Sequence, residues 1–192
     1  MMVTDNHPTT DHAAATRELF ARLFARRVPE VANGDIRIVN VARDVGYYAK
    51  VAVAANVDGL NAAASCIGPR GARIHDVEAS IPGERISVVS FDPDPVRYVA
   101  NALDVDVESV EITSGDLRDI RAVVSVNRFA EAIGKRARNV RLASELTGWH
   151  IAICTARCTS RRHIHPRFDT AARQSVWDLD SEIAEDSVGG GV

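Results

Sequence analysis

The sequence predicts an α+β protein that is built from two copies of one module. The first observation is a repeat, because the stretch Ile67-Gly68-Pro69-Arg70-Gly71 returns 66 residues later as Ile133-Gly134-Lys135-Arg136-Ala137. The second is the order of patterns, since each half of the chain gives a helix, two strands, a helix, the glycine loop, a helix and a strand. Self-similarity at a fixed offset indicates two copies of one supersecondary unit.

The first module is predicted over residues 16–91. Apolar residues at helical spacing from Leu19 to Phe24 predict a helix, which Pro29 should end. Two runs rich in β-forming residues, 36–41 and 47–53, predict a hairpin. A helix of small residues, the glycine loop and a second helix follow, and residues 84–91 form a third strand.

The second module is predicted over residues 92–154 and repeats this order. Asp92-Pro93-Asp94-Pro95 marks the boundary. A helix at 96–103 and a hairpin from the strands 107–113 and 121–126 follow. A short helix at 128–133 then leads into the second loop, a helix at 137–146 and a closing strand at 150–154. The short linker favours two modules that pack as one unit.

The two ends of the chain differ from this pattern. Residues 1–15 are predicted to be a disordered head, and residues 155–192 a mostly disordered tail with a short helix at 171–177. No apolar run approaches the roughly 20 residues that span a bilayer, and the start of the chain lacks the pattern of a secretory signal. With three cysteines, the expected compartment is the reducing cytoplasm.

The two glycine loops are the candidate phosphate-binding sites of the chain. Glycine permits backbone conformations that other residues avoid and leaves no side chain in the way of a ligand, and exposed N–H groups at a helix start can receive a phosphate. Arg70 and Arg73 add positive charge to the first loop. The overall net charge of −3 does not by itself favour nucleic acid, but local patches set phosphate attraction. A plain turn between two helices is the alternative interpretation of a single loop.

Five phrases together resemble the tandem KH region, of type II topology, of the NusA family of transcription elongation and termination factors. They are VARDVGYYAKVAV (41–53), CIGPRGARI (66–74), DPVRYVANAL (94–103), AIGKRARNVRLA (132–143) and LTGWHI (146–151). They occur in order across about residues 17–154. Full-length bacterial relatives also carry an N-terminal polymerase-binding domain and an OB-fold domain, so this chain is expected to be a short form that lacks both.

The resemblance implies that each loop clamps the backbone of single-stranded RNA while the adjacent groove contacts bases. The residues implied at the first loop are Gly68, Pro69, Arg70, Gly71 and Arg73. Those implied at the second are Gly134, Lys135, Arg136, Arg138, Asn139 and Arg141. Apolar groove residues implied to contact bases are Ile67, Ile74, Ile133 and Val140. The expected partners are single-stranded RNA and, through the same resemblance, RNA polymerase or the transcription complex.

Ala137 departs from the family pattern, because it stands where the first loop has Gly71. If this position needs a positive φ, alanine costs on the order of 1 kcal/mol. Two alternatives therefore remain open: a protein-interaction scaffold with degenerate modules, and a KH protein that binds RNA in ribosome assembly or RNA processing.

Other constellations are weaker. Cys154, Cys158, His163 and His165 are zinc-ligand types, but their spacing is not that of a standard finger. No catalytic motif is present, so no enzyme activity, cofactor, metal or small-molecule substrate is expected, nor is a membrane partner. Trp149 is expected to anchor the core, Cys66 to be a small buried residue, and Tyr47 and Tyr48 are candidates for base stacking.

Overall fold

The computed structural model describes residues 8–158 of the 192-residue chain, and its first half forms a three-stranded sheet with helices on one face. The elements are α1 (Pro8–Ala25), α2 (Pro29–Ala32), β1 (Ile36–Asp44), β2 (Tyr48–Ala55), α3 (Ala62–Ile67), α4 (Ala72–Glu78) and β3 (Arg85–Ser90). β1 and β2 pair antiparallel, and β2 pairs parallel with β3. The short η1 turn (Pro69–Gly71) connects α3 to α4.

The second half repeats this arrangement. Its elements are α5 (Pro95–Leu103), β4 (Val107–Ser114), β5 (Asp119–Val124), α6 (Phe129–Ile133), α7 (Arg138–Thr147) and β6 (His150–Cys154). β4 and β5 pair antiparallel, and β5 and β6 pair parallel. Two short turns, η2 (Val126–Arg128) and η3 (Lys135–Ala137), precede α6 and α7 respectively. The predicted α+β fold of two repeated modules is thus confirmed. Within residues 8–158, no helix has the length and apolar character of a membrane span.

Two boundaries differ from the prediction. Residues 8–15 were assigned to a disordered head, whereas α1 begins at Pro8 and includes them. Pro29 was expected only to stop the first helix, but it also occupies the first turn of α2. Proline is tolerated there because its missing N–H would have no helical partner. The predicted tail lies mostly outside the described residues, and Thr155–Cys158 form a turn.

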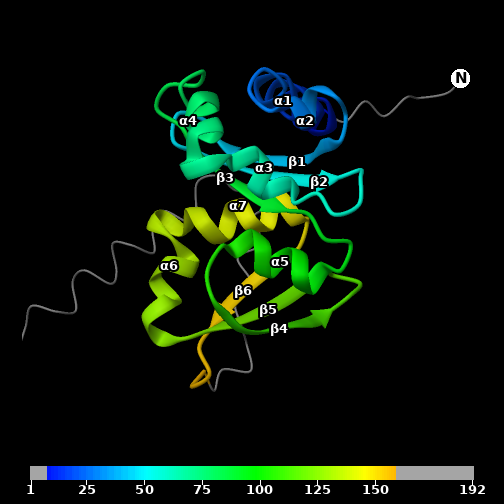
Figure 1. The fold of residues 1–192 in the computed structure, drawn as a ribbon. Helices are drawn as coiled ribbons and strands as arrows, with labels where there is room; N and C mark the ends of the chain where they lie inside the picture. Colours follow the sequence, from blue (N-terminus) through cyan, green and yellow to red (C-terminus); the bar gives the residue numbers. More distant parts are fainter. Residues whose placement is uncertain (1–7, 159–192) are drawn as a thin grey trace, which may run out of the picture.

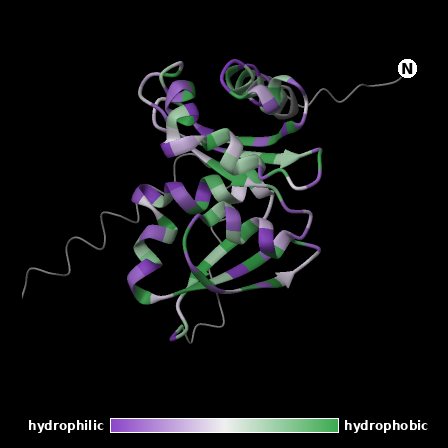
Figure 2. Ribbon diagram, viewed as in Figure 1, coloured by the Kyte–Doolittle hydropathy of each residue, from purple (hydrophilic) through white to green (hydrophobic). Residues whose placement is uncertain are grey.

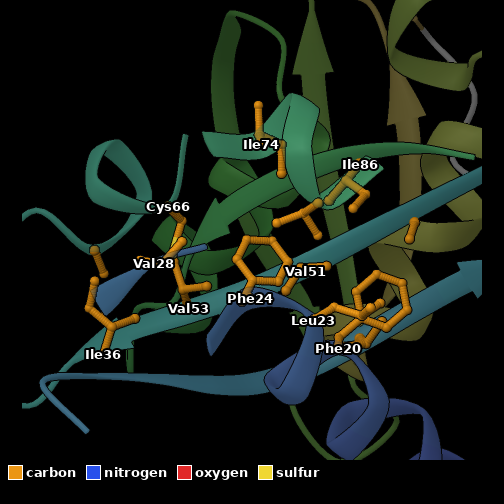
Figure 3. Packing of buried hydrophobic residues seen from close by; sticks show 14 residues of the cluster. Phe20, Leu23, Phe24, Val28, Ile36, Val51, Val53, Cys66, Ile74 and Ile86 are labelled. Atoms are coloured by element: carbon orange, nitrogen blue, oxygen red, sulfur yellow. The ribbon is translucent and has the colours of Figure 1, made fainter. Parts of the chain in front are cut away.

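The first hydrophobic core lies on one face of the first sheet. Phe20, Leu23 and Phe24 of α1 pack here with residues of the strands, of α3 and of α4 (Figure 3). Phe20 and Phe24 are completely buried. Cys66 is buried in the same cluster, and this burial raises the pKa of its thiol to about 12. The interpretation of Cys66 as a small buried residue is therefore confirmed.

The opposite face of the first sheet packs on the second module. Ala42, Ala52 and Val89 of this face belong to the same buried cluster as residues of α5, α7 and the second sheet. Figure 1 shows the resulting layers: α1, α2 and α4, then the first sheet, then α5 and α7, then the second sheet. Figure 2 shows that hydrophobic residues are frequent along the strands of both sheets. The first sheet is thus buried on both faces, which makes the two modules one packed unit.

Polar groups also join the modules at the end of α7. The Asn40 amide nitrogen donates to the Leu146 carbonyl oxygen at 2.8 Å, and the Tyr98 hydroxyl donates to the same oxygen at 3.2 Å. The last turn of a helix leaves carbonyls without helical partners. One residue from β1 and one from α5 therefore satisfy a carbonyl that the helix itself leaves free.

A lysine is buried at the same boundary. Lys50 lies on β2, is 1% exposed and pairs in register with Ala42 and Ser87. Burial lowers the pKa of its ammonium to about 8, although the nearby Asp104 carboxylate opposes this shift. Asp104 accepts a hydrogen bond from the Ser87 hydroxyl at 3.2 Å. The module boundary thus contains a charge that is costly to bury.

Candidate nucleic-acid interface

The two glycine loops have almost the same backbone. The first glycine has φ 73° in Gly68 and 76° in Gly134, and the third residue has φ 54° in both Arg70 and Arg136. In each loop the fourth N–H donates to the carbonyl of the first glycine, at 3.1 Å in the first and 3.0 Å in the second. Both loops lie on the same side of the molecule, at the left in Figure 1.

The first glycine of each loop is required by close packing. A Cβ at position 68 would lie 2.6 Å from Cγ of Arg73, and one at position 134 would lie 2.8 Å from the backbone nitrogen of Asn139. Real Cβ atoms do not approach neighbours so closely. Substitutions at Gly68 and Gly134 would therefore change the fold as well as any ligand contact, and tests of binding must use other loop positions.

The fourth position of each loop has the left-handed conformation. Gly71 has φ 76° and Ala137 has φ 54°, so the condition under which alanine is strained at position 137 is met. A Cβ at position 71 would meet only ordinary contacts, the nearest being Cε1 of His75 at 3.7 Å. The two positions therefore differ in backbone strain and not in available space.

We expect two single substitutions at these positions to have opposite effects on the stability of the protein. Ala137→Gly should raise the free energy of unfolding, and Gly71→Ala should lower it, each by about 1 kcal/mol, because alanine is strained where φ is positive. Urea denaturation followed by circular dichroism measures both. Ala130→Gly in α6 is a control, where glycine should instead destabilise. A loss of stability in Ala137→Gly would contradict the strain assigned to this loop.

Three predicted cations are exposed at the tips of the loops: Arg70, Lys135 and Arg136. Among residues 8–158, Arg70 and Lys135 enter none of the ion pairs that the structure contains. Exposed cations on a glycine-containing turn attract a phosphate through their local field. These side chains have the exposure that a phosphate contact needs.

The predicted residues behind the loops have partners inside the protein. Arg73 pairs with Glu30 at 3.1 Å and donates to the Ser65 carbonyl at 2.9 Å. The Asn139 amide nitrogen donates to the carbonyls of Leu103 at 2.8 Å and Ala132 at 3.0 Å. Arg73 and Asn139 therefore hold helix ends in place, and their predicted contacts with RNA stay predictions.

Arg138 and Arg141 share one partner from the first module. Nε of Arg138 lies 2.8 Å from Oδ2 of Asp44, and Nη2 of Arg141 lies 3.3 Å from the same oxygen. Arg141 also lies 3.9 Å from Glu145. The side chains of Arg138 and Arg141 remain 26% and 34% exposed. The start of α7 is therefore tied to the end of β1.

The apolar residues predicted to contact bases separate into two groups. Ile67 is 38% exposed and Ile133 is half-buried. Ile74 and Val140 were predicted to line the grooves, whereas they are 8% and 4% exposed and belong to the two cores. Both lie near the start of a helix whose inner face packs on a sheet. Of this set, Ile67 offers the most accessible apolar surface beside a loop.

An open groove of about 460 Å³ crosses the boundary between the modules. Residues 88–90 of β3, the end of α5 and part of α6 line it. This lining contains three carboxylates, those of Asp104, Asp106 and Glu131, and one guanidinium, that of Arg128, which pairs with Glu131. The excess of negative charge opposes phosphate, so the backbone of a nucleic acid is better placed at the loops than in this groove.

Two residues that the sequence did not place at either loop lie beside the second loop. Asp44 pairs with Arg138, and the Arg138 guanidinium carbon lies 4.9 Å from the ring centroid of Tyr47. The sequence indicates Tyr47 as a candidate for base stacking, but no local signal places it near residue 138. Trp149, in contrast, packs partly buried against the second core, as predicted.

The candidate metal site is only partly described. Cys154 is buried and Cys158 is exposed, and neither forms a disulfide within residues 8–158. His163 and His165 lie outside the described residues. In residues 8–158, no group of three or more acidic, histidine or cysteine side chains is placed to hold a metal ion.

Comparison with known proteins gives two adjacent matches to family models. Residues 14–91 match the NusA-like first KH domain, and residues 95–160 match the NusA-like second KH domain. The crystal structure of APE1850 is 22% identical, covers 75% of this chain and 97% of its own, and superposes with a TM-score of 0.52. That similarity concerns the fold.

Two curated relatives carry the name transcription termination/antitermination protein NusA. The protein from Mycobacterium tuberculosis (strain ATCC 25618 / H37Rv) is 46% identical over 136 residues, which are 70% of this chain and 39% of that protein. The protein from Halalkalibacterium halodurans is 33% identical over 186 residues, which are 96% of this chain and 46% of that protein. The chain therefore spans less than half the length of these relatives.

Proposed function

Residues 14–160 of this chain belong to the NusA-like tandem KH family, and from that premise we propose that the chain binds single-stranded RNA through its two glycine loops. The process is transcription elongation, termination or antitermination, with the transcription complex and its RNA polymerase as the protein partner. The proposed role is that of a binding protein in the cytoplasm, without catalytic activity.

The observation that carries this proposal is the duplicated loop with its exposed cations. Both loops present the same backbone turn, and Arg70 and Arg136 occupy equivalent positions with the same φ. KH loops of this kind clamp the backbone of about four nucleotides, and splayed bases supply specificity. Two such loops on one side of a rigid unit suit one continuous strand.

Rigidity of the unit supports simultaneous use of both loops. The first sheet is covered on both faces, and Asp44 joins the first module to the start of α7 beside the second loop. Linking two binding sites in a fixed geometry makes the second contact intramolecular, which raises the overall affinity. Each loop by itself is small, so the pair is proposed as the functional unit.

We expect saturable binding to RNA that weakens with salt. Fluorescence anisotropy of a labelled A-rich 12-nucleotide single-stranded RNA, titrated from about 50 to 200 mM salt, measures it. If the three exposed loop cations contact phosphates, the slope of log K against log salt should be about −2, which is roughly a fifteen-fold loss over this range. A labelled RNA duplex of equal length is the control and should bind more weakly.

Absence of saturable binding by the native chain at about 50 mM salt would overturn this proposal. It would favour the protein-interaction scaffold, for which Ala137 in the second loop is the specific observation. Co-purification with RNA polymerase distinguishes the transcription role from binding in ribosome assembly or RNA processing.

A further inference from the structure

The tip of the first hairpin reaches across the module boundary to the second loop. Asp44, the last residue of β1, accepts a hydrogen bond from Nε of Arg138 at 2.8 Å. Arg138 directly follows Ala137, the residue that closes the second loop. The hairpin residues 45–47 are therefore next to a loop that belongs to the other half of the chain, 94 residues away in sequence.

Tyr47 is an exposed aromatic residue at this tip. Its relative exposure is 59%, and the guanidinium carbon of Arg138 lies 4.9 Å from the ring centroid. The distance is that of a cation–π contact. A ring that touched Arg138 only to join the modules would be expected to bury more of its surface. The remaining exposed area is available to a planar ligand.

The hairpin tip is held in place by a buried carboxylate. Glu84 is 5% exposed, accepts two hydrogen bonds from Arg43 at 2.8 and 2.7 Å, and accepts a third from the Gly46 N–H at 2.9 Å. The hydrogen bonds from Arg43 hold the pKa of Glu84 below its usual value. The backbone on which Tyr47 stands is thus fixed before any ligand arrives, which lowers the entropy cost of binding.

We propose that Tyr47 is a stacking site for one nucleobase of a single-stranded RNA whose backbone the second loop holds. The first module supplies this residue to the second module's site. Single-stranded bases are characteristically held by stacking on aromatic rings next to a basic surface that tracks the backbone. Tyr47 has such a surface beside it, because Arg138 contacts the ring and Lys135 and Arg136 precede it in the loop.

This inference rests on the proposed function and adds a consequence to it. Stacking tolerates every base, because each has a π face. Tyr47 should therefore contribute affinity at one nucleotide position with little preference for its identity. Arg138, held by Asp44 and in contact with the ring, acts as a positioning residue for this site.

The test uses the full chain and the labelled A-rich 12-nucleotide RNA. Tyr47→Leu keeps an apolar side chain but removes the aromatic ring, and we expect about ten-fold weaker binding. Tyr47→Trp should retain the affinity, and the fluorescence of the new indole should be quenched by RNA beyond the change seen in the native chain. Leu117→Ala is the matched control, because Leu117 is similarly exposed, at 55%, between β4 and β5 of the second module.

A scan with abasic nucleotides separates stacking from a structural role. In the native chain, one abasic position should cost about ten-fold in affinity, and in Tyr47→Leu the same position should cost little more. Unchanged affinity of Tyr47→Leu would overturn the inference. So would a loss that simply adds to every abasic substitution, since Tyr47 would then act only by supporting Arg138. If the native chain fails to bind any RNA, the proposed function fails, and this inference fails with it.

Discussion

Reversing one charge in the first loop should strongly reduce RNA binding. In Arg70→Asp, an exposed cation becomes an anion, and we expect affinity for the A-rich RNA to fall at least about ten-fold, because a charge-assisted phosphate contact is replaced by repulsion. Aspartate tolerates the left-handed backbone of this position, where φ is 54°. Folding should therefore persist, and fluorescence anisotropy reports the loss.

The same substitution at two other arginines makes this experiment specific. Arg136→Asp alters the equivalent position of the second loop, and Arg118→Asp alters an exposed arginine with φ 53° between β4 and β5. All three variants change the net charge equally on similar backbones. Loss confined to Arg70→Asp would indicate one working clamp, and loss in both loop variants would indicate two. An equal loss in Arg118→Asp would contradict specific contact at the loops.

Removal of the buried lysine should stabilise the protein. Lys50→Met keeps a long unbranched side chain and removes the ammonium from the module boundary. The pKa of Lys50 is lowered from 10.5 to about 8 in the folded protein. At pH 7 both states carry the proton, so the full burial cost is present, on the order of 3 kcal/mol. Urea denaturation at pH 7 should show Lys50→Met as the more stable protein.

The stability difference between Lys50→Met and the native chain should depend on pH. Between pH 8 and 10.5 the unfolded chain binds more protons at Lys50 than the folded one, so this group makes the native chain more stable as pH rises. The advantage of Lys50→Met should therefore shrink over this range. Burial raises the pKa of Cys66 and of Tyr98 to about 12. These two groups lower the stability of both proteins at high pH, so only the difference between the proteins is diagnostic.

The other lysine of the chain provides the control. Lys135 is exposed at the second loop. Lys135→Met should therefore leave the free energy of unfolding nearly unchanged, both at pH 7 and between pH 8 and 10.5. A Lys50→Met protein that is less stable than the native chain at pH 7 would mean that the Asp104 carboxylate outweighs the cost of burial.

The repeated fold could be predicted because its signals are local. The glycine at φ 73° in one loop has its counterpart at φ 76° in the other, and the same turn chemistry produces both. The alignment of Ala137 with Gly71 identified the position where a positive φ would matter, and the structure shows that φ is positive there. In contrast, Pro29 gave a correct stop signal for α1 and also began α2, because proline ends one helix and suits the first turn of the next.

The candidate site was only partly predictable, because its supporting contacts are distant in sequence. Spacing showed that Ile74 and Val140 lie on apolar helix faces, but a groove and a core require the same spacing. Only the packed structure shows that both face the cores. The contact of Asp44 with Arg138 joins positions 94 residues apart. No pattern within either module signals that pairing or the placement of Tyr47.

The doubly covered first sheet has a consequence for synthesis of the chain. Proteins are made from the N-terminus, so β3 is complete at Ser90, while α7, the later of the two helices that cover the sheet's second face, ends 57 residues later at Thr147. At about 5–20 residues per second, synthesis of these residues takes roughly 3–11 s. During this time the apolar face around Ala42, Ala52 and Val89 is not yet covered by α7. During each round of translation, the nascent first module therefore has an uncovered apolar face for several seconds.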